Sequence, residues 1–173
     1  MSETPATSAR WRLSLGMASV AVRRGGAPEL ARVLHEHAGL APPEPGRWVG
    51  DDTLALVWSA PGQFLVAGDP EATQRLVEAL HGHALVIDLS GGRVVVRVSG
   101  MSARDVLARC VPLDLHPRAM RPGHAASTIA AHIGVQIWQI DAAPTYDIAG
   151  PASYAASLRR ALEQSGARFE DVS

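Results

Sequence analysis

The sequence has one cysteine, no lysine and no long apolar run. A single thiol, that of Cys110, excludes an internal disulfide and any metal site built from several thiolates of one chain. No stretch reaches the roughly 20 apolar residues that a membrane-spanning helix needs, and the first residues carry no apolar segment typical of a secretion signal. We therefore expect a cytoplasmic protein that does not enter a membrane.

Charge is not concentrated anywhere in the chain. All 16 basic residues are arginine, and 17 acidic residues balance them to a net charge of -1. Binding to nucleic acid or to an anionic membrane needs a concentrated basic surface, so neither is expected as a partner. The 173 residues, 47% of them apolar, are enough to build a folded core.

Proline, glycine and capping residues mark the expected helices. Asp69 before Pro70 is the clearest start signal, and Ser102 is the expected N-cap of a helix that buries Cys110. The expected helices cover residues 28–38, 70–81, 102–110 and 151–165. Apolar runs bounded by turn residues predict strands at residues 13–22, 54–58, 64–67, 85–89, 93–98, 127–131, 135–140, 145–149 and 168–172.

Two parts of the chain repeat the same pattern. The segments that begin at Leu54 and at Gly134 each give a strand ending in tryptophan, a turn, a strand running into glycine and a helix opened by proline. A strand and a helix precede each segment, so the chain predicts two β-α-β-β-α-β units. The expected fold class is α+β, with two fused ferredoxin-like halves and antiparallel sheets.

The repeat also sets the expected domain organisation. Residues 1–11 are polar, small and aperiodic, and are expected to form a flexible tail. Residues 12–173 are expected to form a single globular domain of two pseudo-repeats, about 12–90 and 91–173. Residues 39–52 and 111–125 are rich in proline and are expected to be irregular crossings.

No catalytic group of residues stands out. The seven histidines lack the spacing of a metal site, and a solvated or locally bonded role is expected for them. Asp88, Asp141 and Asp147 lie in or next to expected strands and are interpreted as turn-capping carboxylates rather than active-site acids. The chain has no dinucleotide fingerprint, phosphate-binding glycine loop or nucleophile elbow.

Arginine and methionine together mark a candidate docking loop. Arg118, Met120 and Arg121 lie in an irregular segment that is expected to be exposed. Both residue types are common in the centres of protein interfaces. We expect these three residues to contribute to a subunit interface.

Several segments together resemble a known family: VIDLSGGRVVVRVSG from Val86, SARDVLARC from Ser102, RPGHAASTIA from Arg121 and YAASLRRALE from Tyr154. With the Trp138 strand, they resemble the folate-binding aminomethyltransferase superfamily and, more closely, the gamma subunits of heterotetrameric sarcosine oxidase. The resemblance covers about residues 12–166. It implies a fold like the aminomethyltransferase folate domain.

The resemblance also implies a function. It implies a complex with alpha, beta and delta subunits that oxidatively demethylates sarcosine to glycine, forms hydrogen peroxide and passes the one-carbon unit to tetrahydrofolate. FAD, FMN and NAD would belong to the other subunits, and the gamma subunit has no assigned catalytic residue. Aminomethyltransferases carry an acidic pair at positions that fall near Ile137 and Trp138, where this chain is apolar. The chain is therefore expected to be a noncatalytic structural subunit that binds no cofactor alone.

Two other functions fit the same fold. An independent folate-binding one-carbon transferase would need a carboxylate such as Asp88 or Asp141 in its pocket. A regulatory module of ferredoxin-like type would bind a small ligand and self-associate, with no partner.

Overall fold

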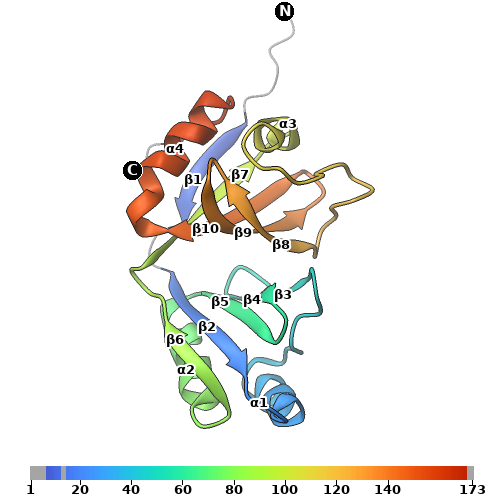
Figure 1. The fold of residues 1–173 in the computed structure, drawn as a ribbon, viewed down its shortest axis with the longest axis vertical. Helices are drawn as coiled ribbons and strands as arrows, with labels where there is room; N and C mark the ends of the chain where they lie inside the picture. Colours follow the sequence, from blue (N-terminus) through green and yellow to red (C-terminus); the bar gives the residue numbers. More distant parts are fainter. Residues whose placement is uncertain (1–6, 13–14, 171–173) are drawn as a thin grey trace, which may run out of the picture. The chain divides into compact units, whose positions relative to one another are not determined.

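A computed structural model describes residues 7–12 and 15–170 (Figure 1). The described residues form two compact units. The first half consists of those within Ser14–Ser90. The second half consists of those within Gly91–Ser173 together with those within Met1–Leu13.

The first half is a five-stranded antiparallel sheet with two helices. Its strands lie in the order β3-β4-β5-β2-β6. The helices supply Leu30, Leu34 and Leu76 to a core that also takes apolar residues from the strands. The elements are β2 (Gly16–Val22), α1 (Ala27–Ala38), β3 (Trp48–Gly50), β4 (Leu54–Ala60), β5 (Gln63–Gly68), α2 (Pro70–Leu80) and β6 (Ala84–Asp88).

Capping and close backbone approach explain the boundaries in this half. Asp69 accepts hydrogen bonds from the amides of Glu71 and Ala72, as the sequence predicts, and Gly39 ends α1 in the left-handed conformation. Position 68, the last of β5, requires glycine because a Cβ there would lie 2.2 Å from the carbonyl oxygen of Thr53. The expected irregular crossing at residues 39–52 contains the short strand β3.

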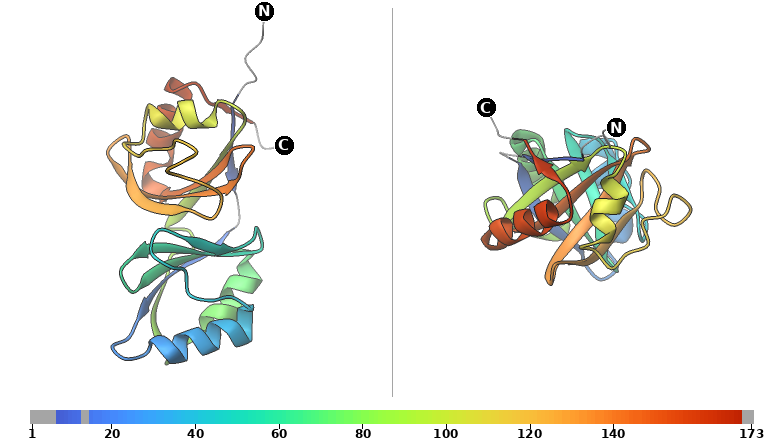
Figure 2. Two further views of the ribbon diagram at one scale, coloured as in Figure 1. Left: turned by 90° about the vertical axis from the view of Figure 1, so that its right-hand side faces the viewer. Right: turned by 90° about the horizontal axis from the view of Figure 1, so that it is seen from above.

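The second half is a six-stranded sheet with the order β11-β1-β7-β10-β9-β8. All pairs are antiparallel except β1 with β11. Figure 2 shows α3 and α4 on one side of this sheet. The elements are β1 (Ser8–Arg12), β7 (Arg93–Ser99), α3 (Ala103–Ala108), β8 (Ala125–Ala130), β9 (Ile133–Asp141), β10 (Thr145–Pro151), the 3-10 turn η1 (Ala152–Tyr154), α4 (Ala155–Gln164) and β11 (Arg168–Phe169).

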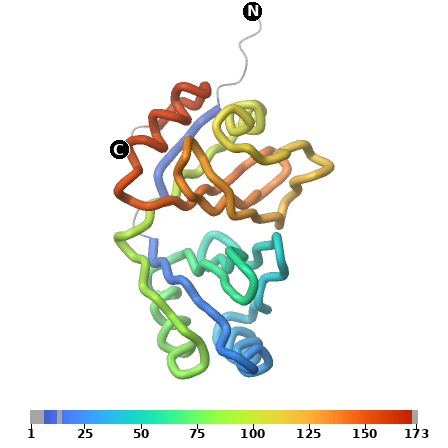
Figure 3. The backbone as a smooth tube through the Cα atoms, viewed as in Figure 1, coloured from blue at the N-terminus to red at the C-terminus, as the bar shows by residue number. Residues whose placement is uncertain are grey.

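The predicted α+β class with two ferredoxin-like halves is confirmed. The opening strand of each half, β2 or β7, has a neighbour on each side. One neighbour, β5 or β10, is the second strand of a hairpin, and the other neighbour differs between the halves. In the first half that other strand is β6. In the second half it is β1, and the closing strand β11 lies beyond it. Figure 3 shows the blue β1 running beside the yellow-green β7. The halves therefore repeat one pattern, and the second has one strand more on this side.

Strand β1 corrects the expected tail. Residues 8–11 belong to this strand, whereas residues 1–6 lie outside the described part of the chain. Ala9 is fully buried in the core, and Trp11 packs on it beside Phe169, with ring centroids 5.6 Å apart. The strand has only two inward side chains, too few for a period of two to be recognised in the sequence.

Other local expectations need correction. The Ser102 side chain makes no capping bond at the start of α3. The β8–β9 turn is formed by Ala131 and His132, both with positive φ, rather than by residues 132–134. Within residues 7–12 and 15–170, no helix is long and apolar enough to cross a bilayer.

The burial of β1 can be tested with one substitution. Ala9→Asp is expected to lower the free energy of unfolding by about 3 kcal/mol, because it places an unpaired carboxylate in the core. Ala119→Asp makes the same change at an exposed position of the second half; this matched control is expected to change the free energy of unfolding by about 0.5 kcal/mol or less. Urea unfolding measures both. Equal effects of the two substitutions would contradict the placement of β1.

Candidate functional site

One buried acid lies at the centre of the second half. Asp147 is in the middle of β10, where it pairs with Arg97 of β7 on one side and Trp138 of β9 on the other. Its neighbours Tyr146 and Ile148 point into the core cluster, so alternation directs Asp147 to the opposite face of the sheet. The Asp147 side chain is fully buried.

Two guanidinium groups bind this carboxylate. Nε of Arg97 donates to Oδ1 of Asp147 at 2.7 Å, and an Nη atom of Arg97 donates to Oδ2 at 2.8 Å. Nη1 of Arg12 donates to Oδ2, also at 2.8 Å. The two-point pairing of Arg97 with Asp147 is the strong, directional form of an arginine–carboxylate contact. The three residues therefore connect the adjacent strands β1, β7 and β10.

These contacts correct the expectation for Asp147. It does not cap a turn, and its partner Arg97 is only 7% exposed. The available signal was a single charge inside an apolar strand, in VVRV around Arg97 and YDIA around Asp147. Such charges are rarely buried without a partner. Their separation of 50 residues hides the pairing from any local pattern.

The chemistry open to Asp147 is limited by these bonds. Both of its oxygens accept charge-assisted hydrogen bonds from arginine side chains of the same chain. A general base must instead reach the proton that it removes from a substrate. The cluster is therefore suited to joining strands.

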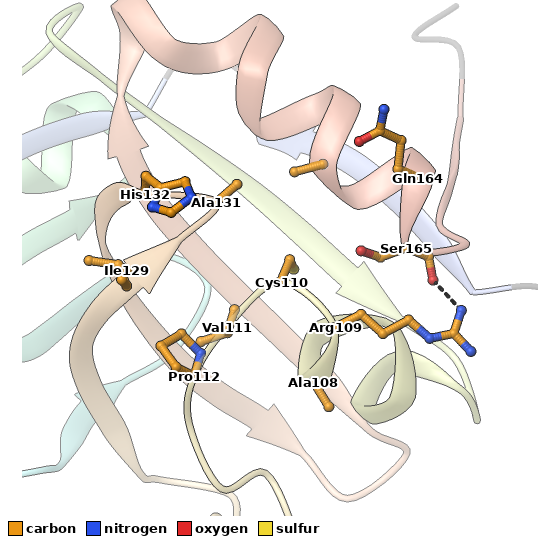
Figure 4. Close-up of a pocket in the computed structure, with 11 residues that line it drawn as sticks. Ala108, Arg109, Cys110, Val111, Pro112, Ile129, Ala131, His132, Gln164 and Ser165 are labelled. Atoms are coloured by element: carbon orange, nitrogen blue, oxygen red, sulfur yellow. Dashed lines mark hydrogen bonds between the residues drawn. The ribbon is translucent and has the colours of Figure 1, made fainter.

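A separate cavity of about 630 Å³ lies in the second half (Figure 4). The end of α3, the β8–β9 turn and the end of α4 line it. Arg109 closes one side through a 3.0 Å hydrogen bond from Nη1 to the carbonyl oxygen of Ser165. His132 and Ile129 lie on the side of the turn. The cavity brings together one thiol, one imidazole and one engaged guanidinium.

Cys110 in this cavity is partly buried rather than a member of the central core. Its Sγ lies 3.5 Å from the carbonyl oxygen of Leu107. Burial raises the pKa of the thiol above its ordinary value, and a hydrogen bond with Ser165 opposes that shift. The thiol therefore stays protonated at neutral pH, which makes it a poor nucleophile.

Asp88 and Asp141 cap turns, as predicted. Oδ1 of Asp88 accepts from the amide of Ser90 at 2.8 Å, and Oδ1 of Asp141 accepts from the amide of Ala143 at 2.9 Å. The Ser90 amide lowers the pKa of Asp88 below its usual value. Among the residues that the structure describes, no three histidine, cysteine or acidic side chains gather in a way that could hold a metal ion.

The candidate docking loop is only partly exposed. Arg118 and Arg121 are exposed, but Met120 is 4% exposed and belongs to the core of the second half. The expectation of an exposed Met120 is therefore corrected: the apolar side chain turns inward and anchors the irregular segment. An interface role for Arg118 and Arg121 stays a prediction.

Comparison with known proteins gives the family. The model of the "Sarcosine oxidase, gamma subunit family" matches residues 24–167. The chain belongs to this family. Two gamma subunits of sarcosine oxidase illustrate the relation: one from Arthrobacter sp is 42% identical over 89 residues, covering 49% of this chain and 43% of its own. One from Corynebacterium sp. (strain U-96) is 34% identical over 116 residues, covering 60% and 56%.

Solved structures agree with the gamma-subunit fold. A chain of heterotetrameric sarcosine oxidase from Corynebacterium sp. U-96, solved with pyrrole 2-carboxylate, superposes with a TM-score of 0.78 at 27% identity, covering 96% of this chain and 88% of that one. Aminomethyltransferase T of the glycine cleavage system from Bartonella henselae gives 0.66 at 16% identity, over 96% and 48%. The second likeness concerns the fold alone. The chain covers only about half the length of the curated gamma subunits it matches.

Within this gamma-subunit fold, the two apolar positions at which the resemblance led us to expect a departure from aminomethyltransferases both lie in β9. Ile137 and Trp138 are fully buried in β9. Ile137 packs in the core cluster, while Trp138 lies beside Asp147 on the other face of the sheet. Neither position offers a carboxylate.

Breaking the buried ion pair is expected to lower the free energy of unfolding more than breaking an exposed one. Arg97→Met is expected to lower the free energy of unfolding by about 3–5 kcal/mol, because Asp147 keeps its burial and loses its two-point partner. Arg32→Met removes an arginine paired with Glu29 and Glu36 on the surface and is expected to cost about 1 kcal/mol or less. Chemical denaturation of both variants checks this, and similar costs would contradict the structural role of Arg97.

Thiol labelling tests the environment of Cys110. Because burial raises the thiol pKa, the folded chain is expected to react with iodoacetamide at pH 8 at least about tenfold more slowly than the urea-unfolded chain. The rate in the folded state should rise further as pH increases above 8, as thiolate forms. Equal rates in the two states would contradict the burial.

Proposed function

We propose that this chain is a noncatalytic, structural gamma subunit of a heterotetrameric sarcosine oxidase. It assembles with alpha, beta and delta subunits in a complex that oxidatively demethylates sarcosine to glycine, forms hydrogen peroxide and passes the one-carbon unit to tetrahydrofolate. Family membership supports the assembly. So does the likeness of nearly the whole chain to one chain of a heterotetrameric sarcosine oxidase.

The observation that carries the noncatalytic role is the state of Asp147. It is the buried acid of the second half, and both of its oxygens are bound by arginine. Asp88 and Asp141 are bound to the backbone of their own turns. The acids on which a folate-dependent transferase would rely are thus occupied in holding strands and turns.

The described residues do not fit a folate site of the aminomethyltransferase kind. At the corresponding positions of β9, Ile137 and Trp138 are buried, and neither side chain has a carboxylate that could accept a proton or a hydrogen bond from a pterin ring. No step of the reaction is therefore assigned to this chain. In the proposed complex, FAD, FMN, NAD and tetrahydrofolate are held by the other subunits, where they supply the redox and one-carbon chemistry.

Co-purification tests this function. The tagged chain expressed alone is expected to be colourless, and the same chain co-expressed with the other sarcosine oxidase subunits is expected to bring down a yellow complex that absorbs at flavin wavelengths. Calorimetry with tetrahydrofolate is expected to show no binding to the isolated chain. Tight folate binding that is lost in Asp141→Asn, with no flavoprotein recovered, would support the independent transferase instead.

A further inference from the structure

In the first half, no strand among the described residues pairs with the outer edge of β6. Strand β6 pairs with β2 on one side and is the last strand of its sheet. Natural proteins protect such edges with charge, proline, a bulge or very short strands, because a free edge recruits another strand. From Ala84 to Ile87 this strand carries no charge and no proline, and its pairing with β2 has no register shift.

The face of β6 away from the helices is apolar and exposed. Ala84 and Val86 pack on the core of the first half, so alternation turns Leu85 and Ile87 the other way. These two side chains are 58% and 63% exposed, two of the largest exposures among the apolar residues described. A single exposed apolar residue has no special meaning, but two neighbours on an unprotected edge indicate a contact surface.

The second half shows what occupies the corresponding position there. Strand β1 lies antiparallel beside the opening strand β7, as β6 lies antiparallel beside β2. The outer edge of β1 is covered by β11, which runs parallel to it and pairs Ser8 with Arg168 and Ala9 with Phe169. The first half has no strand in that place among the described residues. The pattern of the repeat therefore leaves one strand position open, beside β6.

We propose that the outer edge of β6 binds a short extended segment of a partner subunit, which fills the place that β11 fills in the second half. This inference rests on the proposed function, since it requires a partner subunit. By analogy with β11, the segment runs parallel to β6. It contributes backbone hydrogen bonds, and its apolar side chains cover Leu85 and Ile87.

Charges at the two ends of β6 define the chemistry of the segment. Ala84 pairs with Val22, so the exposed Arg23 and Arg24 lie at the first end of the strand. The exposed Asp88 lies at the other end, held by its bond from Ser90. A parallel segment that complements these charges has an acidic residue first, then alternating apolar residues, then a basic residue.

Co-expression of variants with the partner subunits tests the proposal. Ile87→Lys is expected to reduce the flavin recovered with the tagged chain at least about tenfold, because it puts a charge on the contact face. Ile129→Lys, on the exposed part of β8 in the second half, is the matched control and is expected to recover flavin like the parent chain. Each variant is also unfolded with urea in isolation.

A second measurement does not depend on any variant. Hydrogen exchange of the unmodified chain is expected to slow at residues 84–88 by at least about tenfold on assembly. No slowing there in an assembled complex overturns the proposal, and so does full recovery of flavin with Ile87→Lys. If Ile87→Lys is unfolded in isolation, its loss of flavin recovery says nothing about the edge. The hydrogen exchange of the unmodified chain then decides the proposal. If the parent chain recovers no flavoprotein, the proposed function fails.

Discussion

Three strands of the second half are joined through the carboxylate of Asp147. It binds Arg97 on the neighbouring strand and Arg12 on the strand after that, so one acid connects β10, β7 and β1. A buried charge is tolerated only when it is paired and fully bonded. The same constraint fixes the register of the first strand of the chain, which must place Arg12 within reach of β10.

Strand β1 then accounts for the difference between the halves. Both follow the ferredoxin-like pattern, and in each a strand lies beside the opening strand. In the second half β1 takes that place, and β11 covers its outer edge. In the first half β6 takes the equivalent place, and no strand in the described part of the chain pairs with its outer edge. The position beside the flanking strand is thus filled in the second half, whereas in the first half it offers a sheet edge suited to a partner.

Features that depend on residues close in sequence were predicted, whereas features that depend on contacts between distant residues were not. Asp69, Pro70 and Gly39 act within a few residues, so the sequence located α1 and α2 correctly. β1 was missed because its contacts lie more than 80 residues away, in Val96 and Val98. The acids divide in the same way: Asp88 bonds to the backbone two residues on, whereas Asp147 depends on Arg97 and Arg12, to which no sequence spacing points.

The central claim is that this gamma subunit contributes structure rather than chemistry. The most direct test replaces the whole charged cluster with Arg12→Met, Arg97→Met and Asp147→Leu, since apolar residues of similar volume often replace a buried ion pair without loss of stability. Sarcosine turnover is measured per flavin in the purified assembled complex. The account predicts a rate within about twofold of the parent complex. A fully assembled complex that has lost about a hundredfold or more of its turnover would contradict it.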